Sequence, residues 1–167
     1  MTTIRLLQGE ITDNLIIEKR GAVGWITFND PAKHNAMSYD MWASLPKVIK
    51  IFEEDDDIRA VVLTGAGGKS FVSGANISQF EKLRSAADAV AEYERVGEEA
   101  QASIYNCAKP VIARIDGYCI GGGLNLSLCC DIRIASDASS FGIPAGRLGL
   151  GYRLTAIRNL VSTIGAP

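Results

Sequence analysis

The sequence predicts an α/β fold in which most strands are parallel. Apolar segments of strand length alternate along the chain with longer segments of helical periodicity, an order typical of parallel sheets joined by crossover helices. Residues 59–64 are nearly continuous in apolar character, which indicates a strand buried on both faces. No linker, low-complexity tract or repeat divides the 167 residues, so we expect a single domain over 1–167.

The first half of the chain predicts a hairpin, a helix and a buried strand. Ser38 is a good N-cap, and apolar residues follow it at helical spacing. Pro46 lies inside that helix and is expected to kink it. In order, the elements are strands at 15–19 and 23–28, a helix after Ser38, a strand at 59–64 and a glycine-rich turn at 65–70.

The second half continues the alternation and ends in a helix. Its elements are a helix at 86–107, a strand at 110–115, a helix that opens on glycines at 121–128, strands at 131–135 and 139–141, and a helix at 152–163. Glycine is abundant, at 17 residues, so the places where glycines gather are the informative ones.

Composition excludes several classes of function. The net charge of −2 argues against nucleic acid as the main partner. Four cysteines without a C-x-x-C pair and the single His34 make a zinc site unexpected, so no metal is predicted. No apolar run reaches the length of a membrane span. The N-terminus has no secretory pattern, and we expect a cytoplasmic protein.

Two glycine-containing segments expose bare backbone, 70–77 and 117–125. A helix that begins on glycines directs unpaired N–H groups and positive potential at whatever lies there. Such donors would stabilise an oxyanion or enolate if a thioester carbonyl bound there. Taken alone, three glycines at the start of a helix are more often explained by tight packing against a neighbouring strand.

Three familiar motifs are excluded. The phosphate loop requires a glycine where Leu63 stands, and the dinucleotide fingerprint fails at Ser70. Val72-Ser73-Gly74 lacks the first glycine of a nucleophile elbow.

Taken together and in order, seven motifs resemble the crotonase, or enoyl-CoA hydratase/isomerase, superfamily. The resemblance runs from about Leu15 to the end of the chain. The motifs are Asn29-Asp-Pro-Ala-Lys-His-Asn-Ala36, Val61-Val-Leu-Thr-Gly65, Phe71-Val-Ser-Gly-Ala-Asn-Ile77, Lys109-Pro-Val-Ile-Ala113, Asp116-Gly-Tyr-Cys-Ile-Gly-Gly-Gly123, Cys130-Asp-Ile-Arg-Ile-Ala135 and Phe141-Gly-Ile-Pro144.

The resemblance implies a spiral of ββα turns that binds an acyl-CoA thioester, with coenzyme A as part of the substrate and no other cofactor. By position, the two N–H groups that hold the thioester oxygen belong to Ala75 and Gly122. The residues carried over as coenzyme A contacts are Lys33, Ala36, Lys69 and Ser73. For the two lysines, an exposed surface charge is an equal alternative. Relatives form trimer-based homo-oligomers, so a homo-oligomer is expected.

The chain departs from the family pattern at both catalytic glutamates. Hydratases of the family place them three residues after the oxyanion glycine and directly after the Phe-Gly-x-Pro motif, and here these positions hold Asn125 and Ala145. Neither side chain exchanges a proton near neutral pH, which puts the two-glutamate mechanism in doubt. Other polar residues near these loops are better explained as surface or structural residues: Glu81, Asp116, Tyr118, Tyr152 and Arg153.

The family pattern also extends further than this sequence. We therefore expect a truncated core that lacks the C-terminal helical region and leaves Leu154, Ile157 and Val161 partly uncovered, which favours self-association.

Three functions remain open. The first is an acyl-CoA enzyme of the hydratase or isomerase type. The second is a decarboxylase-type reaction that depends mainly on enolate stabilisation. The third is a non-catalytic protein that binds acyl-CoA.

Overall fold

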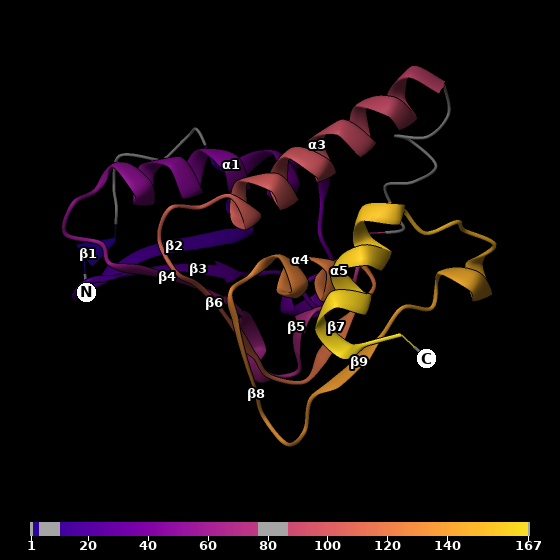
Figure 1. The fold of residues 1–167 in the computed structure, drawn as a ribbon. Coiled ribbons are helices and arrows are strands. Elements are labelled where there is room, and N and C mark those ends of the chain that lie inside the picture. The colour runs from indigo at the N-terminus through magenta and orange to yellow at the C-terminus, as the bar shows by residue number, and fades with distance from the viewer. Residues whose placement is uncertain (1, 4–10, 77–86, 167) are drawn as a thin grey trace.

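The fold places two sheets side by side, with helices α1 and α3 over the larger one (Figure 1). It was analysed as a computed structural model, which describes residues 2–3, 11–76 and 87–166. The larger sheet has the order β1-β2-β3-β4-β6-β8 and the smaller one β5-β7-β9. The strands are β1 (Thr2–Thr3), β2 (Leu15–Arg20), β3 (Val23–Phe28), β4 (Ala60–Gly65), β5 (Ser70–Val72), β6 (Val111–Ile115), β7 (Tyr118–Ile120), β8 (Ile132–Ala135) and β9 (Ser140–Gly142). The helices are α1 (Tyr39–Glu54), α3 (Ala87–Tyr105), α4 (Gly122–Cys129) and α5 (Leu154–Ile164).

The chain repeats one structural unit as it advances. Strands β4, β6 and β8 of the larger sheet are followed by β5, β7 and β9 of the smaller sheet, and these by α3, α4 and α5. All neighbours from β3 onward in the larger sheet, and all pairs in the smaller sheet, are parallel. The predicted crotonase-type spiral of ββα turns, with mostly parallel strands, is therefore confirmed.

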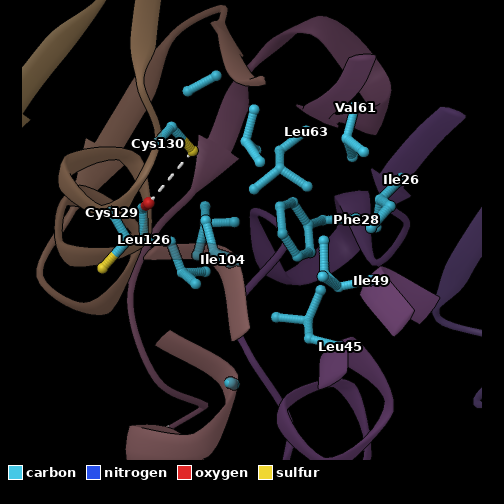
Figure 2. Packing of buried hydrophobic residues seen from close by; sticks show 14 of the residues in the cluster. Ile26, Phe28, Leu45, Ile49, Val61, Leu63, Ile104, Leu126, Cys129 and Cys130 are labelled. Carbon is cyan, nitrogen blue, oxygen red and sulfur yellow. Dashed lines mark hydrogen bonds between the residues drawn. The ribbon is translucent and has the colours of Figure 1, made fainter. Parts of the chain in front are cut away.

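The core lies between α1 and the larger sheet. Leu45 and Ile49 of α1 are buried against Ile26 and Phe28 of β3, with Val61 of β4 beside them (Figure 2). The predicted N-cap is present, because the Ser38 hydroxyl accepts a hydrogen bond from the Met41 N–H at 3.2 Å. Burial of this apolar stripe provides most of the stability of such a helix.

Helix α1 contains the predicted internal proline. It runs from Tyr39 to Glu54 with Pro46 inside it, so the proline does not end the helix, and the expected kink stays a prediction. Proline removes only one hydrogen bond of the helix, and residues on both sides of Pro46, including Leu45 and Val48, are buried in the core. Packing against the sheet therefore outweighs the local cost of the proline.

Two strands of the smaller sheet, β5 and β7, are absent from the sequence-based prediction, whereas β9 is predicted at 139–141. Segments 70–72 and 118–120 belong to the two stretches of bare backbone that a ligand could approach, and they form three-residue strands. Strands of this length are too short to show a two-residue period. Strand β8 was predicted correctly, yet all four of its residues are exposed, including Ile132 and Ile134.

The last helix carries an uncovered apolar face, as expected. Leu154 is 80% exposed, and Ile157 and Val161 are 41% and 38% exposed. Self-association through this face stays a prediction. Among the described residues no helix is long and apolar enough to cross a membrane.

The contact between α4 and β5 requires a glycine at position 123. A Cβ atom at Gly123 would lie 2.1 Å from the carbonyl oxygen of Val72 and 2.7 Å from its Cβ. We expect Gly123→Ala to lower the free energy of unfolding by about 1–3 kcal/mol or more, because backbone of β5 must move. Urea denaturation measures this effect. Gly97→Ala is the matched control, since a Cβ there meets nothing within 4 Å, and an equal loss in both variants would contradict the prediction.

Candidate functional site

One cavity brings together the four residues that were assigned to catalysis. Ala75, Gly122, Asn125 and Ala145 all line it, and its volume is about 400 Å³. The four residues come from three separate parts of the chain: the segment after β5, helix α4 and the short turn after β9. Further wall residues come from α1, from α3 and from the segment just before α5: Trp42, Tyr93, Glu94, Glu98, Tyr152 and Arg153.

The backbone around Ala75 explains why its N–H has no backbone acceptor among the described residues. Ala75 forms an isolated parallel bridge with Met37. The Met37 N–H donates to the Gly74 carbonyl at 2.8 Å, and the Asn76 N–H donates to the Met37 carbonyl at 2.9 Å. Because the two flanking residues make these bonds, the N–H of Ala75 itself points to the opposite side of the strand.

The N–H of Gly122 lies close to that of Ala75. A Cβ at Gly122 would be 3.8 Å from the Ala75 nitrogen, and a Cβ at Gly74 would be 4.0 Å from the Gly122 nitrogen. Gly122 is the first residue of α4, where N–H groups have no partner inside the helix. Within the described part of the chain, neither N–H has a backbone acceptor.

The three consecutive glycines at the start of α4 have three different roles. Gly121 adopts φ 54° and ψ −115°, a backbone conformation that favours glycine. Gly122 leaves space beside the Trp42 ring, which a Cβ would approach to 3.4 Å. Gly123 allows the close contact with β5. Both explanations of the sequence motif therefore hold, at different residues: tight packing at Gly123 and backbone open to the cavity at Gly122.

Asn125 and Ala145, the positions predicted to correspond to the family glutamates, line the cavity without a carboxylate. Asn125 lies one turn into α4, and its side-chain Oδ1 is buried with no hydrogen-bond partner among the described residues. Ala145 begins the short 3₁₀ turn after β9 and contributes only a methyl group. The Trp42 indole Nε1 on the cavity wall is also buried, and it has no hydrogen-bond partner in the described part of the chain. Asn125 Oδ1 and Trp42 Nε1 are thus an acceptor and a donor at the cavity for which the described residues provide no partner.

Tyr152 belongs to the cavity, against the expectation that it is a surface residue. Its hydroxyl donates to the Gly121 carbonyl at 3.2 Å. Burial raises the pKa of Tyr152 to about 12, an effect that a hydrogen bond from the Asn125 side chain partly opposes. The phenol is therefore protonated at neutral pH and serves as a hydrogen-bond donor.

Arg153 also lines the cavity, where it neutralises two carboxylates of α3. Its Nη2 lies 2.6 Å from Glu94 Oε2, and its Nη1 pairs with Glu98. This cluster connects α3 to the residue before α5 and forms one side of the cavity. Glu94 and Glu98 were missed from the sequence, because they lie on the polar face of a long helix and nothing local indicates their partner.

Two further polar candidates, Asp116 and Tyr118, are not among the residues that line the cavity. Asp116 accepts a hydrogen bond from the Ser136 hydroxyl at 2.9 Å, outside the cavity wall. Tyr118 is exposed, with its ring 6.0 Å from that of His34. Glu81 lies outside the described residues. The expectation that these residues are structural or on the surface holds for Asp116 and Tyr118.

The residues expected to contact coenzyme A lie on loops beside Ala75 rather than on the cavity wall. The Ser73 hydroxyl donates to the Lys33 carbonyl at 3.4 Å, and Ala36 precedes the Met37 bridge. Lys33 and Lys69 are both exposed, and the carbonyl of Lys69 accepts a hydrogen bond from the Tyr118 N–H at 3.1 Å. The structure brings these residues to neighbouring loops, and their role stays a prediction.

Asn35 holds these loops in place and was not singled out from the sequence. It is fully buried, and its Nδ2 donates to the Ser70 carbonyl at 2.8 Å and the Ala66 carbonyl at 2.9 Å. Its Oδ1 accepts from the Asp30 N–H at 3.0 Å. A buried, fully paired amide of this kind fixes the relative positions of the segments that it joins.

Comparison with known proteins gives one consistent family. A family model described as enoyl-CoA hydratase/isomerase matches residues 18–166. A short-chain-enoyl-CoA hydratase from Clostridium acetobutylicum is 38% identical over 153 residues, which is 92% of this chain. A mitochondrial 3-hydroxyisobutyryl-CoA hydrolase from Rattus norvegicus is 33% identical and matches 88% of this chain.

The fold agrees with solved structures as well. The crystal structure of an enoyl-CoA hydratase/carnithine racemase from Magnetospirillum magneticum superposes with a TM-score of 0.88 at 34% identity and covers 93% of this chain. The match extends over 58% of that structure's chain and of the Clostridium relative, and 38% of the rat relative. The chain therefore spans a little more than half of the Magnetospirillum and Clostridium proteins and about two fifths of the rat protein.

Proposed function

The chain belongs to the enoyl-CoA hydratase/isomerase family, and from this premise we propose that it binds an acyl-CoA thioester and stabilises negative charge on the thioester oxygen. One observation carries the proposal: the N–H groups of Ala75 and Gly122 lie close together at one cavity, and neither has a backbone acceptor in the described chain. Fixed donors of this kind stabilise charge as it develops on a carbonyl oxygen, and each contributes about 10² to 10³ in rate.

The chemistry that follows depends on where protons come from. In hydration, a water oxygen loses a proton as it adds to the β carbon, and the π electrons pass to the thioester oxygen to give an enolate. The carbonyl then re-forms as the α carbon takes a proton. Neither Asn125 nor Ala145 can carry these protons, and each missing acid–base group costs about 10² to 10⁴ in rate. We therefore expect weak hydration of crotonyl-CoA.

A second candidate is decarboxylation of a malonyl-type thioester, which the absence of carboxylates at positions 125 and 145 favours. The bond between the α carbon and the carboxylate breaks, carbon dioxide leaves, and the electron pair passes into the enolate. A proton from water then reaches the α carbon. This reaction needs an enolate stabiliser and no general base, so the two N–H groups are its main requirement.

A panel of thioesters tests the proposal. Crotonyl-CoA reports hydration, malonyl-CoA and methylmalonyl-CoA report decarboxylation, and the unreactive butyryl-CoA reports binding alone by calorimetry. We expect butyryl-CoA to bind and crotonyl-CoA to be hydrated slowly. Binding without any turnover would identify a non-catalytic acyl-CoA protein, whereas no binding at all would contradict the proposal. Hydration at ordinary enzyme rates would show that the interpretation of Asn125 and Ala145 is wrong.

A homo-oligomer is part of the same proposal. The exposed apolar residues of α5 and β8, with Leu154 at 80% and Ile134 at 59% exposure, support it, because exposed apolar surface commonly marks sites of protein association.

A further inference from the structure

The peptide group between Gly121 and Gly122 joins two features of the cavity. Its N–H is the Gly122 donor that faces the cavity, and its carbonyl is the acceptor of the Tyr152 hydroxyl at 3.2 Å. A trans peptide is planar, with its C=O and N–H directed to opposite sides. Any contact that fixes the direction of this carbonyl therefore fixes the direction of the N–H.

This peptide group has unusual freedom to rotate. It lies between two glycines, and rotation of a peptide plane needs changes only in the ψ of the first residue and the φ of the second. Glycine allows nearly all combinations of these angles. Gly121 already adopts φ 54° and ψ −115°, outside the ordinary regions for other residues. Local sterics therefore do not fix the orientation of the Gly122 N–H, and other contacts must do so.

Two hydrogen bonds hold the carbonyl of Gly121. One comes from the Asn125 N–H at 3.1 Å, in the first turn of α4, where helices fray most readily. The other comes from Tyr152, 31 residues further along the chain and two residues before α5. Of these two donors, Asn125 belongs to α4 itself, whereas Tyr152 lies outside that helix.

We propose that Tyr152 is a positioning residue, whose hydroxyl holds the Gly121–Gly122 peptide in the orientation that directs the Gly122 N–H at a thioester oxygen. The proposal rests on the proposed function and deepens it. Tyr152 acts through the peptide and not on the substrate. A hydrogen bond to a carbonyl also polarises the amide, which strengthens the N–H at the other end. The raised pKa keeps the phenol protonated, so the bond persists across the physiological range of pH.

The test removes the Tyr152 hydroxyl in the variant Tyr152→Phe. The control variant, Tyr105→Phe, removes a hydroxyl elsewhere. Tyr105 is 59% exposed at the end of α3 and does not line the cavity. In the ligand-free protein, NMR should show changed ¹³C′ and ¹H–¹⁵N shifts for Gly121 and Gly122 in Tyr152→Phe, and unchanged ones in Tyr105→Phe. Unchanged shifts in both variants would overturn the proposal without reference to any ligand.

Kinetics and a chromophoric ligand give the second readout. With the thioester that the wild-type protein turns over, we expect kcat to fall about tenfold in Tyr152→Phe, below the loss of a whole donor, with KM within twofold. A bound dienoyl-CoA should show a smaller red shift of its absorption, because its carbonyl is less polarised. A merely structural role would lower the melting temperature and leave kcat and the red shift of bound ligand unchanged, which would overturn the proposal. Failure of the wild-type protein to bind any thioester would instead contradict the proposed function, and the NMR result would still decide whether Tyr152 orients the peptide.

Discussion

Gly122→Pro is expected to lower turnover of the protein's thioester substrate by about 10² to 10³, or about 3–4 kcal/mol, because it removes one of the two donors to the thioester oxygen. Proline has no N–H, and it is well tolerated at the first position of a helix, which Gly122 occupies. The substitution therefore deletes the donor while it leaves α4 intact. Steady-state kinetics, with circular dichroism to verify the helix content, measures the effect.

Gly122→Ala is the matched control for this change. It keeps the N–H and adds a methyl group 3.4 Å from the Trp42 ring, a contact that needs only a small shift of that side chain. We expect the alanine variant to retain most of its turnover. A folded proline variant that turns over as fast as the alanine variant would show that the Gly122 N–H does not hold the reacting oxygen.

Asn125→Glu combined with Ala145→Glu is expected to raise hydration of crotonyl-CoA, by a factor in the range of about 10² to 10⁴ that one acid–base group typically contributes. Both positions line the cavity beside Ala75 and Gly122, so two new carboxylates would reach the α and β carbons of a thioester held there. One carboxylate would act as base toward water and the other as acid toward the α carbon. Their effects need not multiply, because groups that act as a unit are not additive.

The control for the double variant is Asn125→Gln with Ala145→Gln, which matches the size of the new side chains without their charge. Initial rates of crotonyl-CoA hydration compare the two proteins directly. If the glutamate variant is folded and no faster than the glutamine variant, the missing carboxylates are not what limits hydration. In that case another group must supply the protons.

The sequence predicts the larger elements because their patterns are local. Ser38 and the apolar residues after it specify α1, and the continuous apolar run of 59–64 specifies β4. The motifs around Ala75 and Gly122 identify the family, and the structure brings both to one cavity. Short strands escape this kind of reasoning, since β5 and β7 are three residues long and contain no period.

What the sequence alone determines is the order of the larger elements and the family, because both depend on residue types at fixed spacing. It also predicts that acid–base chemistry is missing at Asn125 and Ala145. What only the tertiary structure decides is which distant residues meet. Glu94 and Glu98 are ordinary helix-surface residues until α5 brings Arg153 against them. Nothing in the sequence around Tyr152 indicates that its hydroxyl donates to the Gly121 carbonyl. A hydrogen bond between residues 31 positions apart depends on how two elements pack, and no local pattern of residues encodes that distance.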